Sequence, residues 1–360
     1  MRRLLELNYP LIEIDIKKIR DNAYYIVDYC SKYGIEVMGV AKGVCAFIPI
    51  VKAMQEGGIK KFGDSRIQNI KVMREAGIRE PIYQLRLPML SEVEDVIYWA
   101  DGSLNSEVET IKALSEKAQS YGKVHKIILM VEVGDLREGV MPDDVLSVVG
   151  DIIGLPAIKF EGLGTNVGCY GGVLPSFENT KILVVLATDI EKRYGIKVNT
   201  ISGGTTNTLA LFKKGEMAPG INQFRLGYAI LLGVDNTNFQ TLPKALENTI
   251  RLKTEVVELK VKPSYPIGEI GEDAFGNIPV HEDRGPIKRA IVALGKQDCR
   301  IEGLFSLDES IKILGASSDH LLLDVTESDS IRIGSIIEFS MSYGAMLSLM
   351  TSKYVKKVIV

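Results

Sequence analysis

The sequence is poor in the residues that usually mark metal centres and disulfide-linked folds. It has only three histidines among 360 residues, and they do not cluster. Its four cysteines lie far apart and lack the spacing of a metal site or a disulfide framework. We therefore expect no metal site and no Ser-His-Asp triad, and we expect a reducing cytoplasm as the location.

Long apolar runs and a strong charge of one sign are also absent. No apolar run reaches the length that crosses a membrane, and the opening residues, MRRLLELNYP, are too polar for a signal peptide. The formal net charge is -3, from 43 basic and 46 acidic residues. Neither nucleic acid nor a membrane is therefore expected as a partner.

What the sequence does contain, from about residue 10 to residue 235, is an alternation of short apolar runs with amphipathic segments. Those segments have apolar residues about 3.6 positions apart, and many end in glycine. This alternation predicts an α/β fold, a closed (β/α)8 barrel of the TIM type, with an open doubly wound sheet as the alternative. The eight predicted strands are residues 37–42, 61–64, 82–85, 102–105, 126–133, 159–166, 200–204 and 223–227.

The pattern changes after about residue 236, where the helical spacing fades. Runs rich in β-branched residues alternate with loops that contain proline, glycine, aspartate and serine. We therefore predict two domains. The barrel is expected over residues 10–235, and a C-terminal all-β domain over residues 236–360, which residues 1–9 could join.

Lys42 ends the first predicted strand, VMGVAK, and directly precedes Gly43. Burial of an ammonium group is costly, and it lowers the pKa of a lysine. A neutral amine in such a place is a nucleophile suited to Schiff-base chemistry with an aldehyde. The alternative is a lysine whose side chain extends from the strand end into water.

Two later strand ends carry a candidate anion site. The stretch ISGGTTNTLA, residues 201–210, places glycines and hydroxyl side chains after a strand, and the next strand end adds Gly227 and Tyr228. Exposed backbone N–H groups and hydroxyls suit a phosphate, which barrels often bind after strands 7 and 8. The alternative is an ordinary capped turn.

Charged residues near the strand ends offer further candidates. Arg225 lies within the last predicted strand and is interpreted either as half of a salt bridge inside the barrel or as a partner for an anion or a ring nitrogen. Asp135 and Arg137 lie in the loop MVEVGDLREG, where a solvated charged loop is the alternative.

Several of these motifs together resemble the alanine racemase-like family, the fold-type III pyridoxal-phosphate enzymes. They are the lysine of VMGVAK, FGDSRIQN, GTNVG, SGGTTN and RLGYAILLG, at the ends of five predicted strands. VAKGVCA, YQLRLPMLSE and GTNVGCYGG are most similar to the ornithine racemase branch. The resemblance covers nearly the whole chain and implies a barrel joined to a C-terminal β domain. It also implies a homodimer with shared active sites, in which the β domain of one subunit completes the site of the other.

The resemblance implies a role for each matching residue. Lys42 corresponds to the lysine that bonds covalently to pyridoxal 5'-phosphate, Arg225 to an arginine that faces the ring nitrogen, and Arg137 to an arginine near the phenolic oxygen. The residues implied to hold the cofactor phosphate are Ser202, Thr205, Gly227, Tyr228 and Tyr343.

The sequence departs from the family pattern at three positions. Asn166 stands in place of a histidine beside the cofactor ring, and Ala46 in place of a phosphate-binding tyrosine. Lys296 stands where alanine racemases carry the tyrosine that acts as second base. The second base is therefore left open among Lys296, Cys299 and Tyr265.

The expected function is interconversion of the L and D forms of an amino acid, ornithine or another, by a two-base mechanism with Lys42 as one base. Arg86, Asp135 and Glu272 are candidates to contact the distal group of the substrate. The alternatives are an amino-acid decarboxylase or aldolase on the same scaffold, and a non-catalytic carrier of pyridoxal phosphate.

Overall fold

The computed structural model describes residues 8–235 and 242–360, and they form two compact units. One unit contains residues 16–247 and is called the barrel unit; the other joins the residues up to 15 with residues 248–360 and is called the β unit. Residues 1–7, which the sequence analysis considered for the β domain, lie outside the described residues. Among the described residues, no helix has both the length and the apolar character needed to cross a membrane.

Eight parallel strands close into a barrel in the order β2 to β9, which confirms the predicted fold and excludes the open sheet. Closure is made by β9 against β2, where Glu36 lies opposite Gln223 and Gly39 opposite Leu226. The strands are short and almost wholly buried, because helices cover their outer face and side chains fill the interior. They are β2 (Glu36–Val40), β3 (Phe62–Asp64), β4 (Ile82–Gln84), β5 (Gly102–Asn105), β6 (His125–Met130), β7 (Ile158–Gly164), β8 (Thr200–Ser202) and β9 (Gln223–Leu226).

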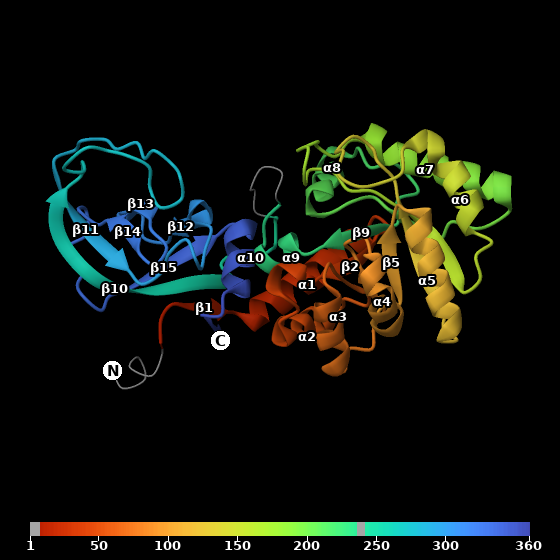
Figure 1. The fold of residues 1–360 in the computed structure, drawn as a ribbon, viewed down its shortest axis with the longest axis horizontal. Helices are drawn as coiled ribbons and strands as arrows, with labels where there is room; N and C mark the ends of the chain where they lie inside the picture. Colours follow the sequence, from red (N-terminus) through yellow and green to blue (C-terminus); the bar gives the residue numbers. More distant parts are fainter. Residues whose placement is uncertain (1–7, 236–241) are drawn as a thin grey trace. The chain divides into compact units, whose positions relative to one another are not determined.

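The helices of the barrel unit lie outside these strands (Figure 1). α7 shows how the local sequence sets their ends. Ser176 accepts a hydrogen bond from the Asn179 N–H at 3.2 Å and forms a capping box, and Gly195 ends the helix with a φ of 66°. The helices are α1 (Ile16–Ser31), α2 (Ile48–Glu56), α3 (Ile67–Glu75), α4 (Val93–Trp99), α5 (Val108–Ser120), α6 (Val145–Ile152), α7 (Phe177–Tyr194), α8 (Ala210–Lys214) and α9 (Tyr228–Leu232).

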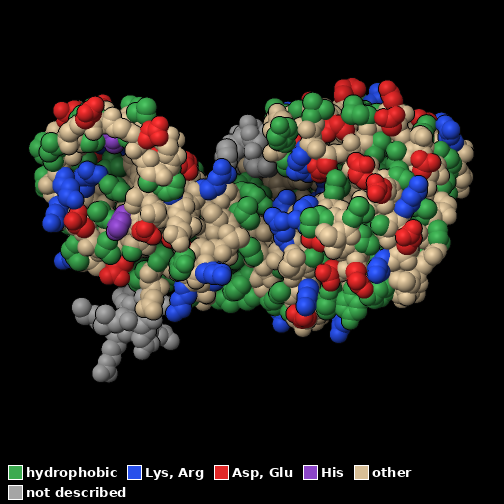
Figure 2. All heavy atoms as spheres, viewed as in Figure 1, with side chains coloured by type: hydrophobic (Ala, Val, Ile, Leu, Met, Phe, Trp, Pro, Cys, Tyr) green, Lys and Arg blue, Asp and Glu red, His purple; other side chains and the backbone are tan. Residues whose placement is uncertain are grey.

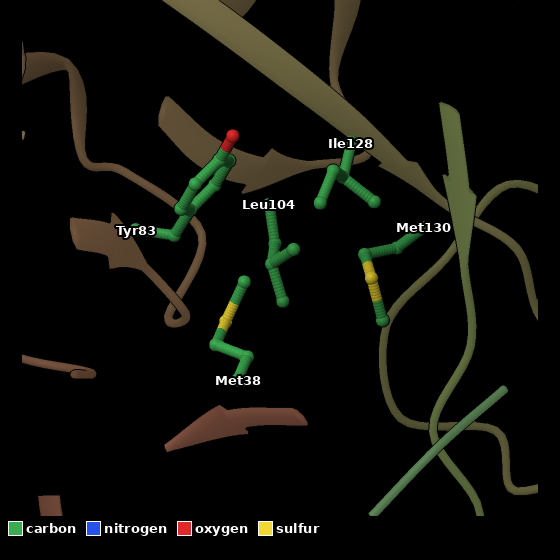
Figure 3. Close-up of a cluster of buried hydrophobic side chains, with 5 residues drawn as sticks. All are labelled: Met38, Tyr83, Leu104, Ile128 and Met130. Atoms are coloured by element: carbon green, nitrogen blue, oxygen red, sulfur yellow. The ribbon is translucent and has the colours of Figure 1, made fainter. Parts of the chain in front are cut away.

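Apolar side chains fill the barrel interior. Met38, Tyr83, Leu104, Ile128 and Met130 point toward one another (Figure 3) and are at most 2% exposed. This cluster closes the interior below the carboxyl ends of the strands, so the barrel is a packed core and not a pore. The loops at those carboxyl ends are left as the place for a site.

The β unit contains one eight-stranded sheet with the path β12-β15-β10-β11-β14-β13, and β1 pairs with both β10 and β16. The long strand β10 curves along much of this unit (Figure 1). The helix α10 (Tyr343–Thr351) was not predicted, because its sequence YGAMLSLMT has no clear polar face; Ser342 caps it. The strands are β1 (Leu11–Ile14), β10 (Ile250–Pro263), β11 (Pro286–Val292), β12 (Leu304–Ser306), β13 (Lys312–Ala316), β14 (Leu321–Asp324), β15 (Ile336–Met341) and β16 (Lys356–Ile359).

Acidic and basic side chains are interspersed over the visible surface of the barrel unit (Figure 2). The picture matches the near-balance of 43 basic and 46 acidic residues in the sequence. A ligand that needs one strong field of charge finds no extended patch for it on this face.

Candidate active site

Lys42 lies just after β2, in the short 3-10 turn Lys42–Val44. The chain turns sharply there, because Cys45 and Ala46 have φ angles of 50° and 49° and the Cys45 N–H donates to the Lys42 carbonyl at 3.3 Å. The Lys42 side chain is partly buried, and among the described residues its ammonium has neither a hydrogen bond nor an ion pair. A lysine that simply extends into water does not fit this position.

The pKa of Lys42 is lowered, and burial is the main cause. The positive charges of Arg137 and Arg225 act in the same direction, whereas Cys169 and Asp64 oppose the shift. A lowered pKa leaves a larger share of neutral amine, which is the form that attacks an aldehyde or accepts a proton. The five side chains come from different strands and loops, so the barrel gathers them around one point at its carboxyl end.

Arg225 lies on β9 and is only 4% exposed. Its Nη1 donates to the Ser202 hydroxyl at 2.6 Å, and its Nη2 donates to the Thr165 carbonyl at 2.5 Å. No described carboxylate lies within ion-pair distance, so the interpretation of Arg225 as half of a barrel salt bridge is wrong. Burial lowers its pKa to about 10, and a buried guanidinium without a counter-charge has donors to offer a ligand.

The loop after β8 contains the glycines and hydroxyls of the candidate anion site. Gly204 has a φ of 132°, and a Cβ there would lie 2.3 Å from the Thr208 hydroxyl oxygen. Thr205 donates from its hydroxyl to Asn207 Oδ1 at 2.9 Å, and Thr206 accepts from the Ala229 N–H at 3.3 Å. This bare, tightly turned backbone is suited to close approach by a phosphate.

Gly227 and Tyr228 follow β9 and lie beside that loop. A Cβ at Gly227 would lie 2.8 Å from the Val40 carbonyl oxygen, so only glycine fits between β9 and β2. Tyr228 is buried, at 8% exposure, and begins α9. Ser202, Thr205, Gly227 and Tyr228 are thus carried by the loops after two neighbouring strands.

Asp135 organises the rim loops after β6 and β7. Its carboxylate accepts four backbone N–H groups of the next loop, and it is 1% exposed. Although burial raises the pKa of Asp135, these four hydrogen bonds outweigh burial and hold it below its usual value. The donors are the N–H groups of Gly168, Cys169, Tyr170 and Val173, at 3.0, 3.3, 2.9 and 3.3 Å.

The loops shaped by Asp135 bring Arg137 and Asn166 to the same rim. Arg137 forms a two-pronged ion pair with Glu138. Asn166 is 7% exposed, and its Oδ1 accepts from the Cys169 thiol at 3.5 Å. Its Nδ2 has no hydrogen-bond partner in the part of the chain that the structure describes. A buried amide with an unused donor calls for an acceptor from outside the chain.

Sequence reasoning did not single out Asp64, which ends β3 and is fully buried. Its Oδ1 accepts from the Arg66 N–H at 2.9 Å and from Asn69 at 3.0 Å, but its Oδ2 has no hydrogen-bond partner among the described residues. Burial raises its pKa to about 6. The only sequence signal was its place in FGDSRIQN, at a predicted strand end.

The remaining predicted residues lie in the β unit. The Lys296 ammonium is 3.6 Å from Asp273 Oδ2 and 4.3 Å from the centroid of the Phe275 ring. Tyr265 is 41% exposed, and Tyr343 is the first residue of α10.

Cys299 is the least suited of the three residues considered for the second base. It is 2% exposed, and burial raises the pKa of its thiol to about 12. A thiol with so high a pKa stays protonated near neutral pH and cannot accept a proton readily.

Arg86 and Glu272 were candidates for the distal group of the substrate. Arg86 pairs with Glu92, through one guanidinium nitrogen that contacts both carboxylate oxygens at 2.7 and 2.6 Å. Glu272 lies in an exposed loop of the β unit. Since Asp135 is engaged by four backbone donors, it is a structural residue of the rim and not an open acceptor.

The residues at the carboxyl end of the barrel fit pyridoxal 5'-phosphate in donor chemistry. Lys42 offers an unpaired amine for the aldehyde, and Arg225 offers unused donors for a ring nitrogen. The glycine and threonine backbone after β8 suits the phosphate, and Asn166 Nδ2 is a buried donor without an acceptor. Among the described residues, no group of three or more His, Cys, Asp or Glu side chains could hold a metal ion.

Comparison with known proteins identifies relatives of the whole chain. Residues 14–234, more than half of it, match the family model described as "Alanine racemase, N-terminal domain". Ornithine racemase of Acetoanaerobium sticklandii is 44% identical over 97% of this chain and 99% of its own length. Lysine racemase of Thermotoga maritima is 40% identical over 97% of this chain and 98% of its own length.

A solved structure supports the fold. Alanine racemase of Clostridium difficile 630 superposes with a TM-score of 0.75, at 18% identity, over 99% of this chain and 97% of that one. At this identity, the likeness concerns the fold alone.

Proposed function

The chain belongs to the alanine racemase family, and from this premise we propose that it is a pyridoxal 5'-phosphate-dependent racemase of a basic amino acid. Two relatives that match over nearly their full length, at 44% and 40% identity, are named for ornithine and lysine, whose side chains both end in an amine. The proposed substrate is therefore an amino acid with a cationic side chain, ornithine or lysine first.

The observation that carries the proposal is the pair of cations Lys42 and Arg225. Within residues 8–235 and 242–360, the Lys42 ammonium has no partner and the buried Arg225 guanidinium has no carboxylate beside it. Burial of an unpaired charge costs free energy, and a ligand that supplies the missing partner offsets this cost. Pyridoxal phosphate supplies an aldehyde, an anion and a ring nitrogen, and when bound it withdraws electrons from the α-carbon of an amino acid.

In the proposed reaction, the neutral Lys42 Nζ accepts the α-proton from one face of the substrate. Arg225 can only donate hydrogen bonds, so it would keep a cofactor ring nitrogen beside it without a proton. Ser202, Thr205, Gly227 and Tyr228 would bind the phosphate, and Arg137 would bind the phenolic oxygen. The family resemblance adds Tyr343 as a candidate phosphate ligand. Racemisation also needs an acid on the other face.

We further propose that the enzyme is a homodimer whose sites are shared. Tyr265 and Lys296 are the β-unit residues proposed to approach the partner's site, because neither is fully buried. A decarboxylase and a non-catalytic carrier are not favoured, since both relatives of nearly full length are racemases.

The proposal is tested by incubating the purified protein with pyridoxal phosphate and a panel of L-amino acids in deuterated water. Loss of chirality together with α-deuterium uptake, greatest for ornithine or lysine, is the expected result. Cofactor binding without any exchange would favour the carrier, and exchange with release of carbon dioxide would favour the decarboxylase.

A further inference from the structure

Cys169 lies in a loop that is fixed from two sides at the carboxyl end of the barrel. From one side, Asp135 accepts the Cys169 N–H at 3.3 Å, together with the three neighbouring N–H groups described above. From the other side, Asn207 donates from Nδ2 to the Val167 carbonyl at 2.7 Å. The position of the thiol is therefore set by the loops after β6 and β8 as well as by its own loop.

The thiol faces the residues of the candidate site. Cys169 Sγ is 3.5 Å from Asn166 Oδ1, and Cys169 lies close enough to Lys42, Arg137 and Arg225 to interact with them electrostatically. Beside it, Asn166 is more than nine-tenths buried and keeps its Nδ2 without a partner, which indicates that a ligand atom belongs next to the thiol. Cys169 itself is exposed and can be reached.

Topology brings Cys169 and Lys42 to the site from different sides. Lys42 follows β2 and Cys169 follows β7, and β8 and β9 separate these two strands around the closed barrel. Arg225, on β9, lies between them in the strand order. A flat ligand held against Arg225 would therefore lie between the loop that carries Lys42 and the loop that carries Cys169.

We propose that Cys169 is the second acid–base group of the racemisation, so that the barrel itself supplies both groups. This inference rests on the proposed function. In one direction, Lys42 Nζ accepts the α-proton and the Cys169 thiol gives its proton to the other face of the α-carbon, which leaves an ammonium and a thiolate. In the other direction, the thiolate accepts the α-proton and the ammonium returns one, so protons and charges balance.

The test uses Cys169→Ala and Cys169→Ser in deuterated water with each enantiomer of the preferred substrate. Loss of one of two bases should slow interconversion by about 10²–10⁴-fold. The enantiomer served by Lys42 should still exchange its α-proton, with retention of configuration. Tyr170→Phe is the matched control, because the Tyr170 side chain is 76% exposed and its backbone N–H still bonds to Asp135.

Interconversion close to wild type in both Cys169 variants would overturn the proposal. Equal loss of exchange from both enantiomers, in variants that fold and bind cofactor, would also overturn it, because the thiol would then act on both steps. A wild-type protein without any exchange would instead refute the proposed function.

Alkylation of the cofactor-free protein gives a readout that does not depend on turnover. Iodoacetamide should modify Cys169, and pyridoxal phosphate should slow this reaction several-fold if the thiol lines the cofactor site. Peptide mass spectrometry resolves Cys169 from the buried Cys30 and Cys299. Equal alkylation rates with and without the cofactor would place the thiol outside the site and contradict the proposal.

Discussion

The two ends of the barrel differ in how their polar groups are paired. Toward the amino ends of the strands, Glu161 accepts a hydrogen bond from the Tyr83 hydroxyl and lies 3.8 Å from the Lys126 ammonium. Lys61 pairs with Glu36 at 2.7 Å. Buried or half-buried charges here have partners within the chain, as expected where a charge only has to be tolerated.

At the carboxyl ends of the same strands, several buried polar groups lack partners within the described part of the chain. Lys42 has no ion pair, Arg225 has no carboxylate, and Asn166 Nδ2 and Asp64 Oδ2 have no hydrogen bond among the described residues. A ligand bound at this end would supply the missing partners. Single unpaired oxygens also occur toward the amino ends, at Glu80 Oε2 and Gln223 Oε1, so the contrast rests on the cations. Among the described residues, Lys42 and Arg225 have no acidic partner, whereas Lys61 and Lys126 each have one.

The strongest test of this contrast replaces one lysine at each end by methionine, which keeps an apolar stem. Lys42→Met should lower racemisation by about 10⁴-fold, because the amine that accepts the α-proton is gone. It should not lower the free energy of unfolding of the cofactor-free protein, since an unpaired ammonium is removed.

Lys126→Met is the matched control at the amino end. It should keep its activity and lose stability in urea unfolding, because Glu161 loses its cation. If Lys126→Met lost activity to the same degree as Lys42→Met, the division between the two ends would be wrong.

The buried carboxyl group of Asp64 should make the free energy of unfolding depend on pH. The pKa of Asp64 is about 6 in the folded chain, above the ordinary value of 3.8, so the folded state holds the extra proton between these values. The stability of the wild type therefore falls as pH rises through this window. Asp64→Asn does not titrate, and its free energy of unfolding relative to wild type should rise by up to about 3 kcal/mol from pH 3.5 to pH 7.

Urea unfolding of the cofactor-free proteins at the two pH values measures this change. Glu161→Gln is the control at the amino end, where weaker contacts with Tyr83 and Lys126 should lower stability at both pH values. A constant difference between Asp64→Asn and wild type would show that the carboxyl group is not shifted.

Tyr83→Phe should cost stability without affecting catalysis. The variant removes a hydroxyl that donates to the buried carboxylate of Glu161, at a cost of about 1–3 kcal/mol. The apolar ring stays in the interior cluster with Met38 and Leu104. Thermal unfolding and steady-state kinetics check the two halves of this prediction, and a large fall in kcat would contradict it.

The smallest expected effect is that of Asp135→Asn. The variant has one oxygen in place of two to accept four N–H groups, so the loop that carries Cys169 and Asn166 should become less well fixed. We expect kcat/KM to fall about tenfold, which corresponds to about 1.4 kcal/mol. An unchanged kcat/KM would show that the hydrogen bonds to the Asp135 carboxylate are not needed to position this loop.

The sequence predicted much of this arrangement because strand ends are local features. All eight barrel strands were predicted near their observed positions, and Lys42 and Arg225 were recognised because a lysine or an arginine in an apolar run is unusual. Because all strands of a (β/α)8 barrel are parallel, their carboxyl ends could be predicted to lie on one rim.

What the sequence did not predict depends on contacts between distant residues. Asp135 was considered as a contact for the distal group of the substrate. Its carboxylate instead accepts hydrogen bonds from four N–H groups some 33 to 38 positions away. The salt-bridge alternative for Arg225 could be rejected only by the absence of a carboxylate beside it. The missing partners of Asp64 and Asn166 become visible only when every neighbour is placed.

The central claim is that the unpaired end of the barrel binds pyridoxal phosphate through Lys42. Its most direct test is to load the protein with pyridoxal phosphate, reduce it with borohydride and locate the stable adduct by peptide mass spectrometry. The account predicts a single modified residue, Lys42, and no modification of Lys61 or Lys126, which are paired at the amino end. A stable adduct on another lysine with Lys42 unmodified would contradict it.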